Sequence, residues 1–594
     1  MTAIIFNNAG RRLQWAIGAG PVDEAPAPVA VASVNVHDTN NEDETNRGDI
    51  NHEKQAANTP VETGVSTIEA SQALWGKTGR WLIIIGLCLV MIVYELDNTT
   101  VYIYRNYAVS DFNSLSELAA LTTAGTIVFA VVKPPIAKLS NVVGRGPMYA
   151  ITISFYCLSY VLMAASKSFG MYAAGLMLYF VGQSGTNLLN DIVIADITTA
   201  RWRALGIGIS FWPFLVMPWT SALIIDNVTS PDGIGWRWGI GMLAIVMPFC
   251  ASFIITTLLY YQGKAKKEGL APKARISLYE FCSQIDVGGV VLFSGGLALL
   301  LLPLTLAATT PSQWQTPWII GLLVAGMVLL IALPFYEHYL ARNPVVPPHY
   351  FANRTIGLCL LLIAMDNVGF SATHTYIYAW VTVAKGLGAR DATFFTFVNG
   401  VTQCLVAIVA GVAMLRTGRY KWICVLGSVV RLVGYGVMVR LRGSENGTAE
   451  IFIVQLIQGI GSGMVGTTLL VPAQVVLPHR EMPQVTALVI CFAFVGGSIG
   501  SCIAGGIYTN TLQPALWKYL GSGTTAETVA ALANSINGVV PDWGTPERVA
   551  VSYAFSEVMK YMTYAAVGTS AIALLGSTFL SNFELPDRNN LVEE

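Results

Sequence analysis

The sequence has few charged residues, because Lys, Arg, Asp and Glu make up only 12% of its 594 residues. Soluble domains average about 25%. Hydrophobic residues make up 54%, and they fall in runs of about 20 residues, the length at which a helix crosses a bilayer core. A helix suits that place because it satisfies its own backbone hydrogen bonds, which lipid cannot do. The composition excludes a soluble globular domain and predicts an all-α, multi-pass membrane protein.

The sequence also lacks the patterns of an enzyme or a metalloprotein. It has no nucleotide-binding motif and no pairing of a nucleophile with a base, so we expect neither an enzyme nor a pump driven by ATP. It has nine cysteines and six histidines, but none stands at the spacing of a metal site. We therefore expect no disulfide framework, no metal site, no resident cofactor and no nucleic-acid partner.

What the sequence does contain is an internal repeat. Gly86-Leu-Cys-Leu opens an apolar run that reaches Glu95, and Gly357-Leu-Cys-Leu opens another that reaches Asp366 at the same offset. Two further pairs follow in the same order: Gly144-Arg145 with Gly418-Arg419, and Gly182-Gln-Ser-Gly-Thr-Asn-Leu-Leu with Gly463-Met-Val-Gly-Thr-Thr-Leu-Leu. Parallel repeats of this kind are typical of secondary transporters, whose substrate site lies between the two halves.

The apolar runs predict fourteen spans. They lie near residues 81–104, 114–137, 147–166, 170–194, 203–225, 236–260, 286–307, 317–336, 354–381, 391–415, 422–441, 450–473, 483–508 and 560–581. The halves align only if spans one to six match spans nine to fourteen, which leaves spans seven and eight as an inserted pair. The expected domains are an acidic tail (1–75), a six-helix bundle (76–262), a basic loop with two extra helices (263–340), a second six-helix bundle (341–582) and a short tail (583–594).

The basic loops predict that both termini face the cytoplasm. Lys and Arg in short loops favour that side, and the basic residues between 138–145, 201–203, 264–275 and 416–421 all fall on one side, together with the N-terminal tail. Arg440 and Arg442 break the rule, although the nearby Asn446-Gly-Thr sequon suits an outside loop. The N-terminal tail is mostly acidic and without periodicity, so we expect it to be disordered.

The last outside loop, residues 509–558, is the only long one that this topology predicts. It carries Tyr553 and other aromatic residues among Gly, Thr and Pro. A lid over the entrance and an ordinary solvated loop both remain open.

The loop after span two carries a motif with a known relative. It reads Ala137-Lys-Leu-Ser-Asn-Val-Val-Gly-Arg145, with Lys138, Asn141 and Gly144 inside it. This resembles the Gly-x-Leu-x-Asp-x-x-Gly-Arg cytoplasmic motif of the major facilitator superfamily, whose charges latch the inner gate. Asn141 replaces the usual Asp, which puts the carboxylate part of that latch in doubt, and Gly418-Arg419 is the degenerate second copy. The resemblance implies a major facilitator fold, here with fourteen helices in a six-plus-two-plus-six order.

A narrower resemblance comes from Tyr94-Glu-Leu-Asp-Asn-Thr-Thr, Tyr107-Ala-Val-Ser-Asp-Phe and Lys133-Pro-Pro-Ile-Ala-Lys-Leu. Together with fourteen spans and a long final outside loop, these are similar to the fungal siderophore-iron transporters of the superfamily. Within that family the chain is most similar to carriers of ferric triacetylfusarinine C and related hydroxamates. The resemblance implies a monomeric importer in the plasma membrane or in endosomal vesicles.

Three carboxyl groups and a histidine are candidates for proton coupling, because ionisable groups at membrane depth are costly and face the bundle interior. Glu95 and Asp97 point about 200° apart on a regular helix, so we expect one to titrate and the other to pack near the outer surface. The family pattern favours Asp97, whereas the repeat favours Glu95, which aligns with Asp366. A structural role for Asp366 stays open, and His374 is either a satisfied structural residue or a group that titrates near neutral pH.

Several polar side chains are candidates for contact with the substrate. Arg431 lies in the middle of span eleven and needs a partner, for which Asp366 is a reasonable choice. Lys133 is expected to snorkel to the cytoplasmic surface, and Pro134-Pro135 to kink its helix. Gln183, Asn187, Asn190 and Asp191 share one face of span four, as cavity-lining groups or as helix–helix hydrogen bonds. The other candidates are Tyr94, Asn98, Phe370, Tyr376, Gln403 and Tyr553.

A ferric hydroxamate is bulky, nearly neutral and already fully coordinated, so its carrier needs aromatic, hydroxyl and amide groups rather than metal ligands. Because a neutral cargo gains nothing from the membrane potential, we expect proton symport through Asp97, Glu95 or Asp366. A fourteen-span drug/proton antiporter is the alternative. Such exporters carry a Gly-Pro-x-x-Gly-Gly run in span five, which Gly208 to Trp219 does not contain.

Overall fold

The computed structural model describes residues 74–197, 212–230, 232–268, 282–283, 286–306, 315–341, 344, 349–476, 482–521, 524–536 and 540–582. Within these ranges the regular structure is helical and contains no strand. The tail expected over residues 1–75 lies almost wholly outside the described residues, as do residues 583–594 and most of the basic loop after residue 268.

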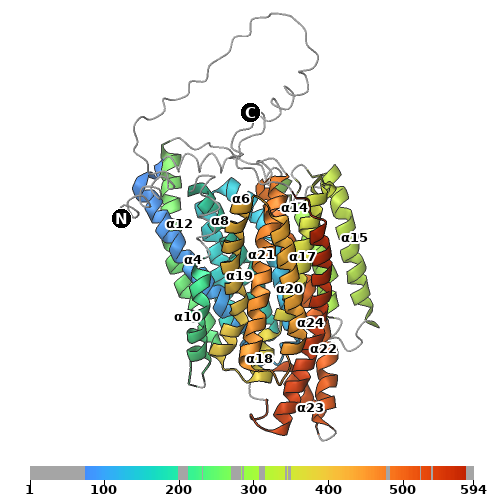
Figure 1. The fold of residues 1–594 in the computed structure, drawn as a ribbon. Helices are drawn as coiled ribbons and strands as arrows, with labels where there is room; N and C mark the ends of the chain where they lie inside the picture. The colour runs from blue at the N-terminus through green and yellow to red at the C-terminus, as the bar shows by residue number, and fades with distance from the viewer. Residues whose placement is uncertain are drawn as a thin grey trace, which may run out of the picture.

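The helices run nearly parallel in one bundle (Figure 1). In chain order they are α4 (Gly76–Asp111), η2 (Leu115–Glu117), α5 (Leu118–Val131), α6 (Lys133–Val143), α7 (Arg145–Ala164), α8 (Phe169–Ile197), α10 (Trp212–Thr229), α11 (Gly235–Gly241), α12 (Leu243–Lys267), α14 (Val287–Leu306), α15 (Pro317–Tyr339), α16 (His349–Ala352), α17 (Arg354–His374), α18 (Ile377–Lys385), α19 (Ala389–Thr417), α20 (Lys421–Leu441), α21 (Thr448–Val475), α22 (Met482–Leu520), α23 (Ala526–Asn534) and α24 (Pro546–Thr578).

Ten helical segments among the described residues are long and apolar enough to cross a membrane, and two shorter apolar helices accompany them. The segment α8 has 29 residues but is not one of the ten, because its glycine, amide and carboxyl side chains lower its mean hydropathy. The prediction of an all-α membrane protein is confirmed.

The two halves of the chain pack in the same pattern. In the first half (α4–α12), α7 packs on α8 and α12 packs on both α4 and α7; in the second half (α17–α24), α20 packs on α21 and α24 packs on both α17 and α20. Small residues permit these approaches: a Cβ atom at Gly86 would lie 2.8 Å from Ile254 N, so α4 can touch α12 closely. The halves meet where α5 packs on α22 and α10 packs on α19.

The pair α14 and α15 lies outside this repeat. Helix α14 packs against α15, and also against α5 of the first half and α22 of the second. Phe293, Leu297 and Leu301 of α14 join Ile127 of α5 and Cys491 of α22 in one buried cluster. The extra pair therefore covers one of the two seams between the halves.

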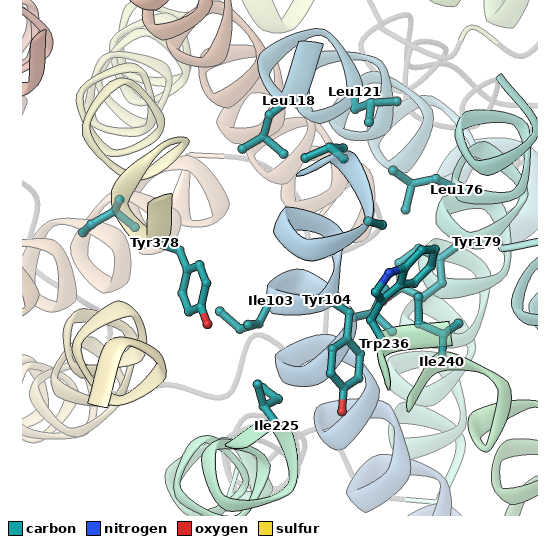
Figure 2. Close-up of a cluster of buried hydrophobic side chains, with 14 of the residues drawn as sticks. Ile103, Tyr104, Leu118, Leu121, Leu176, Tyr179, Ile225, Trp236, Ile240 and Tyr378 are labelled. Carbon is teal, nitrogen blue, oxygen red and sulfur yellow. The ribbon is translucent and has the colours of Figure 1, made fainter. Parts of the chain in front are cut away.

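The bundle has two distinct ends (Figure 1). One, called here the α23 end, carries α18 and α23; the opposite one, the α6 end, carries α6. The largest hydrophobic cluster contains Ile103 and Tyr104 of α4, Trp236 of α11 and Tyr378 of α18, so it joins both halves at the α23 end. Figure 2 shows these side chains around α4.

The expected long loop over residues 509–558 is wrong, because most of it is helical. Helix α22 continues to Leu520 and α24 already begins at Pro546. Thr545 caps α24 by accepting from Arg548 N, and Thr525 caps α23 by accepting from Thr528 N. These polar caps satisfy the first N–H groups of each helix, so the segment folds into helix ends and α23 instead of an extended loop.

The expected kink at Pro134-Pro135 is confirmed as a break. Helix α5 ends at Val131 and α6 begins at Lys133, with proline in its first turn. A proline fits there because the first N–H groups of a helix have no partner within it.

Candidate functional site

Asp97 lies at the centre of the first half, inside a cage of tyrosines. Its side chain is fully buried, and Oδ2 accepts hydrogen bonds from Tyr156 of α7 at 3.0 Å and Tyr179 of α8 at 2.9 Å. Tyr160 stacks on Tyr156 with the ring centroids 5.3 Å apart. Among the described residues no cation lies within ion-pair distance of Asp97. A carboxyl group buried without a cation is suited to binding and releasing a proton.

A chain of hydrogen bonds joins Asp97 to Glu95. Gln183 Nε2 donates to the Tyr179 hydroxyl at 3.0 Å and to Asn98 Oδ1 at 3.2 Å. Asn98 Nδ2 in turn donates to Glu95 Oε2 at 3.3 Å. The two carboxyl groups on opposite sides of α4 are thus linked through α8.

The expectation that one of these carboxyl groups packs near the outer surface is wrong. Glu95 is 4% exposed and Asp97 0% exposed. Both sides of α4 are covered, because the side of Asp97 faces α7 and α8 and the side of Glu95 comes within electrostatic range of Cys404 on α19.

Asp366 and Arg431 form a buried ion pair in the second half. Arg431 Nε lies 2.6 Å from Asp366 Oδ1, and Nη2 donates to Oδ2 at 3.2 Å. The guanidinium also donates to the backbone carbonyl oxygens of Asp366 and Gln458, and it lies over the Tyr435 ring at 5.3 Å. Asp366 is thus the partner of Arg431 that the sequence suggested. Asp366 therefore has the counter-charge that Asp97 lacks.

His374 and Phe370 of α17 lie next to this pair. The two rings stack at 4.2 Å, and His374 Nδ1 lies 3.0 Å from the Phe370 carbonyl oxygen, to which it donates. His374 is 4% exposed and its Nε2 has no partner in the described part of the chain.

The polar side chains on one face of α8 make two different kinds of contact. Asn187 accepts from Lys133 Nζ at 2.7 Å, and Asp191 lies within electrostatic range of the same ammonium group. Asn190, in contrast, accepts from Tyr149 of α7 at 2.6 Å and is buried between these two helices. The cavity-lining expectation is therefore wrong for Asn190 in this conformation.

Lys133 does not snorkel to the surface. Besides its bond to Asn187, its ammonium group lies 4.6 Å from the Phe129 ring centroid and 5.8 Å from that of Phe494 on α22. A snorkelling lysine keeps its charged head in water, whereas this one is held between the two halves by an amide and aromatic faces.

The remaining candidates lie in different places. Tyr94 is buried on α4 and Gln403 is partly exposed on α19. Tyr376 is 1% exposed, stacks on Tyr508 at 4.0 Å and donates to the Ser116 carbonyl, so it closes the bundle instead of facing an open space. Tyr553 donates to Glu445 at 2.7 Å in a polar surface cavity of about 740 Å³ at the α23 end.

The two halves are hydrogen-bonded to each other at the α23 end. Tyr107 of α4 and Tyr378 of α18 share a bond of 2.9 Å, and Tyr102 donates to the His374 carbonyl. Deeper along the α5–α22 seam, Thr126 and Ser498 share a bond of 2.5 Å. The α23 end is therefore closed in this conformation.

Comparisons with known proteins identify the family to which this chain belongs. Residues 83–365 match the Major Facilitator Superfamily. The chain is 30% identical to MFS siderochrome iron transporter C of Aspergillus fumigatus over 519 residues, which cover 85% of this chain and 84% of the relative. It is also 30% identical to siderophore iron transporter mirC of Emericella nidulans over 541 residues, 88% of each chain. The chain belongs to the fungal siderophore-iron transporters of the major facilitator superfamily.

A solved structure supports the fold of this transporter. A bacterial homologue of the human lysosomal transporter Spinster, in an inward-facing and unoccupied conformation, superposes with a TM-score of 0.56, covering 85% of this chain and 98% of that one. At 13% identity this likeness shows the fold alone.

In the superfamily motif at the α6 end, Arg145 is paired with a carboxylate that lies outside the motif. Gly144 turns the chain with φ +102°, a conformation that favours glycine. Arg145 Nε then lies 3.2 Å from Asp196 Oδ2 at the end of α8, and Nη1 donates to Ser140 at 2.7 Å. Asp196 thus offers Arg145 a carboxylate, although Asn141 replaced the motif's own; the Lys138 and Asn141 side chains lie outside the described residues. Gly418 ends α19 at φ +62°, and Arg419 is exposed.

Sequence reasoning missed several buried polar residues of this transporter. The tyrosines around Asp97 carry no local signal, since aromatic residues are common in apolar helices. Arg442, which broke the positive-inside rule, is 1% exposed and donates to the Thr373 carbonyl. Arg105 lies just beyond the predicted end of span one, near residue 104, whereas α4 continues to Asp111.

Proposed function

We propose that this transporter imports ferric siderophores of the hydroxamate type by proton symport. The relatives named as siderophore-iron transporters support the cargo class. The observation that carries the coupling is the asymmetry of the carboxyl groups: Asp97 is fully buried with no cation beside it in the described part of the chain, whereas Asp366 is paired with Arg431. We therefore assign the transported proton to Asp97, with Glu95 at the other end of its hydrogen-bond chain.

The proposed driving force suits a neutral cargo. One proton that moves inward through 100 mV gains about 2.3 kcal/mol, enough for a forty- to fiftyfold gradient before any pH difference is counted. Asp366 and His374 then serve structure rather than coupling, because Arg431 compensates the carboxylate and a backbone carbonyl holds the imidazole. Iron enters only as cargo, and no resident cofactor is part of the proposal.

The proposed architecture is fourteen spans in two six-helix bundles with the α14–α15 pair between them. The shared packing pattern of the two halves supports it. The domain limits follow as 76–262, 263–340 and 341–582, with cytoplasmic tails at 1–75 and 583–594. In this topology the α6 end faces the cytoplasm and the α23 end faces outside, in the plasma membrane or in endosomal vesicles. We propose a monomer.

The contacts between the halves support the proposed alternating access. The closed α23 end is held by the Tyr107–Tyr378 and Tyr102–His374 bonds, so opening outward requires these bonds to break. Arg145 and Asp196 act at the α6 end of the same cycle. The proposed cargo contacts are Tyr94, Asn98, Gln183, Asn187, Asp191, Phe370 and Gln403.

The deciding experiment is uptake of radioactive iron in cells that lack their own siderophore carriers. Iron is presented on a neutral trihydroxamate, on a catecholate and as an unchelated salt, each with and without a protonophore. Accumulation of the hydroxamate alone, abolished by the protonophore, is the expected result. Accumulation that persists without a proton gradient contradicts symport, and no uptake of any complex contradicts the import of siderophores.

A drug/proton antiporter is separated from this proposal by the direction of flux. Cells that express the transporter should not become more resistant to cytotoxic organic compounds, and they should not lose preloaded dyes faster than control cells do. Span five has no Gly-Pro-x-x-Gly-Gly run, which favours import.

A further inference from the structure

Arg105 is a buried arginine that has no counter-charge among the residues that the structure describes. It lies near the Asp111 end of α4 and is 5% exposed. Its guanidinium carbon lies 4.9 Å from the centroid of the Tyr102 ring, and within the described part of the chain it makes no hydrogen bond or ion pair. Its Nε is fully enclosed and has no acceptor.

The other buried arginines among the described residues all have oxygen partners. Arg431 is paired with Asp366, Arg442 donates to the Thr373 carbonyl, and Arg145 lies 3.2 Å from Asp196 Oδ2. A guanidinium removed from water is costly unless carboxylates or carbonyl oxygens surround it. Arg105 therefore lacks a partner that this fold supplies elsewhere, which points to an oxygen-rich ligand.

Arg105 lies next to a residue of α4 that contacts the second half. At helical spacing it shares a face of α4 with Asn98 and Tyr102. Asn98 belongs to the hydrogen-bond chain between Asp97 and Glu95. Tyr102 reaches the second half, because the centroids of its ring and the Phe397 ring lie 5.9 Å apart and its hydroxyl donates to the His374 carbonyl. Arg105 thus lies beside the contacts that separate the proposed cargo path from the α23 end.

We propose that Arg105 binds the hydroxamate oxygens of the cargo, an inference that rests on the proposed function. Each hydroxamate is a monoanion that holds iron through two neighbouring oxygens, and those oxygens keep lone pairs on the outside of the complex. The planar guanidinium presents a fork of N–H groups that matches two neighbouring oxygens, which a lysine ammonium does not. The guanidinium carbon lies over the Tyr102 ring, 4.9 Å from its centroid.

The test compares Arg105→Gln and Arg105→Lys with the unchanged protein and with Arg390→Gln. Arg390 is a matched control, since it is exposed and paired with its neighbour Asp391 at the same end of the bundle. Initial uptake rates are measured at several concentrations of a neutral ferric trihydroxamate, and surface abundance is measured on the same cells. The KM of Arg105→Gln should rise about tenfold to a hundredfold, with maximal rate per surface molecule changed less than about twofold. Arg105→Lys should fall in between, and Arg390→Gln should match the unchanged protein.

An unchanged KM in Arg105→Gln overturns the proposal. If that variant fails to reach the surface, Arg105→Lys decides, because it keeps the charge: an unchanged KM then refutes the fork geometry. A second cargo, a ferric trihydroxamate with one free carboxylate, separates the two sources of anionic oxygen. If only this cargo loses affinity, the contact is to the carboxylate and the assignment to hydroxamate oxygens is wrong. Absence of uptake by the unchanged protein refutes the proposed function itself, which is a different result.

Discussion

Replacing Asp97 by asparagine should separate transport from accumulation. The amide has nearly the same volume as the carboxyl group, and its oxygen can still accept from Tyr156 and Tyr179 at the distances now seen, 3.0 and 2.9 Å. The tyrosine cage should therefore persist. What the amide cannot do is bind and release a proton.

The size of the effect follows from the driving force. With one coupled proton and a potential of 100 mV, a neutral cargo can be concentrated about forty- to fiftyfold. Without a coupled ion the cargo can only equilibrate, so its concentration ratio across the membrane should approach one. Asp97→Asn should thus lose nearly all accumulation while keeping exchange of cargo across the membrane.

The assay uses purified protein in liposomes with an imposed potential and pH gradient. Net uptake of a radioactive ferric trihydroxamate reports accumulation, and counterflow into liposomes loaded with unlabelled cargo reports exchange. Counterflow should survive in Asp97→Asn while net uptake disappears. Full accumulation in this variant would refute the assignment of the proton to Asp97. If Glu95→Gln then showed the loss instead, the proton site would lie at the other end of the hydrogen-bond chain.

Three further predictions follow from the contacts. Arg431→Met leaves the Asp366 carboxylate buried without its partner and should destabilise the protein by about 3–5 kcal/mol, which is measured as a lower melting temperature in detergent. Adding Asp366→Asn should restore most of the lost stability, and equal stability of the single and double variants would show that the pair is unimportant. Thr123→Cys places a thiol beside Cys502, since the present Thr123 Oγ1 lies 3.6 Å from Cys502 Sγ. An oxidant should then join α5 to α22 through a disulfide and stop uptake until a reductant is added, while uptake by Thr123→Ser should not respond to the oxidant. Tyr107→Phe removes the bond to Tyr378 at the α23 end and should favour opening there by about 0.5–1.5 kcal/mol, measured as faster labelling of a cysteine introduced behind this contact; unchanged labelling would mean that the bond does not hold the gate.

The helix breaks, the Gly144 turn and the order of the two halves were readable from the sequence because they depend on local chemistry. Pro134 and Pro135 lie in the first turn of α6, where the missing N–H groups of proline cost no hydrogen bond. Gly144 takes a positive φ that other residues rarely adopt. The matched motifs of the repeat fall on α4 and α17, on the turns before α7 and α20, and on α8 and α21, which pack alike in both halves.

The end of a helix in water was harder to place. Apolar runs mark where a helix crosses lipid, but α4, α22 and α24 continue beyond those runs. Polar side chains at the ends of such helices are capped or solvated, so hydropathy gives no sign that the helix goes on. The segment after residue 508 was misplaced for this reason, whereas Arg105 lies in a buried extension of α4 beyond the apolar run.

The sequence by itself determined that this protein is a helical membrane carrier with two related halves, because length, hydropathy and repeated motifs are properties of each segment alone. Only the tertiary structure decided which buried charges are compensated. Asp366 meets Arg431 from another helix, and Arg145 comes within 3.2 Å of a carboxylate at the end of α8. Within the described ranges, Asp97 and Arg105 are left without counter-charges. Such partners come from helices far apart in the chain, and their spacing is set by how the helices pack rather than by any pattern within one of them.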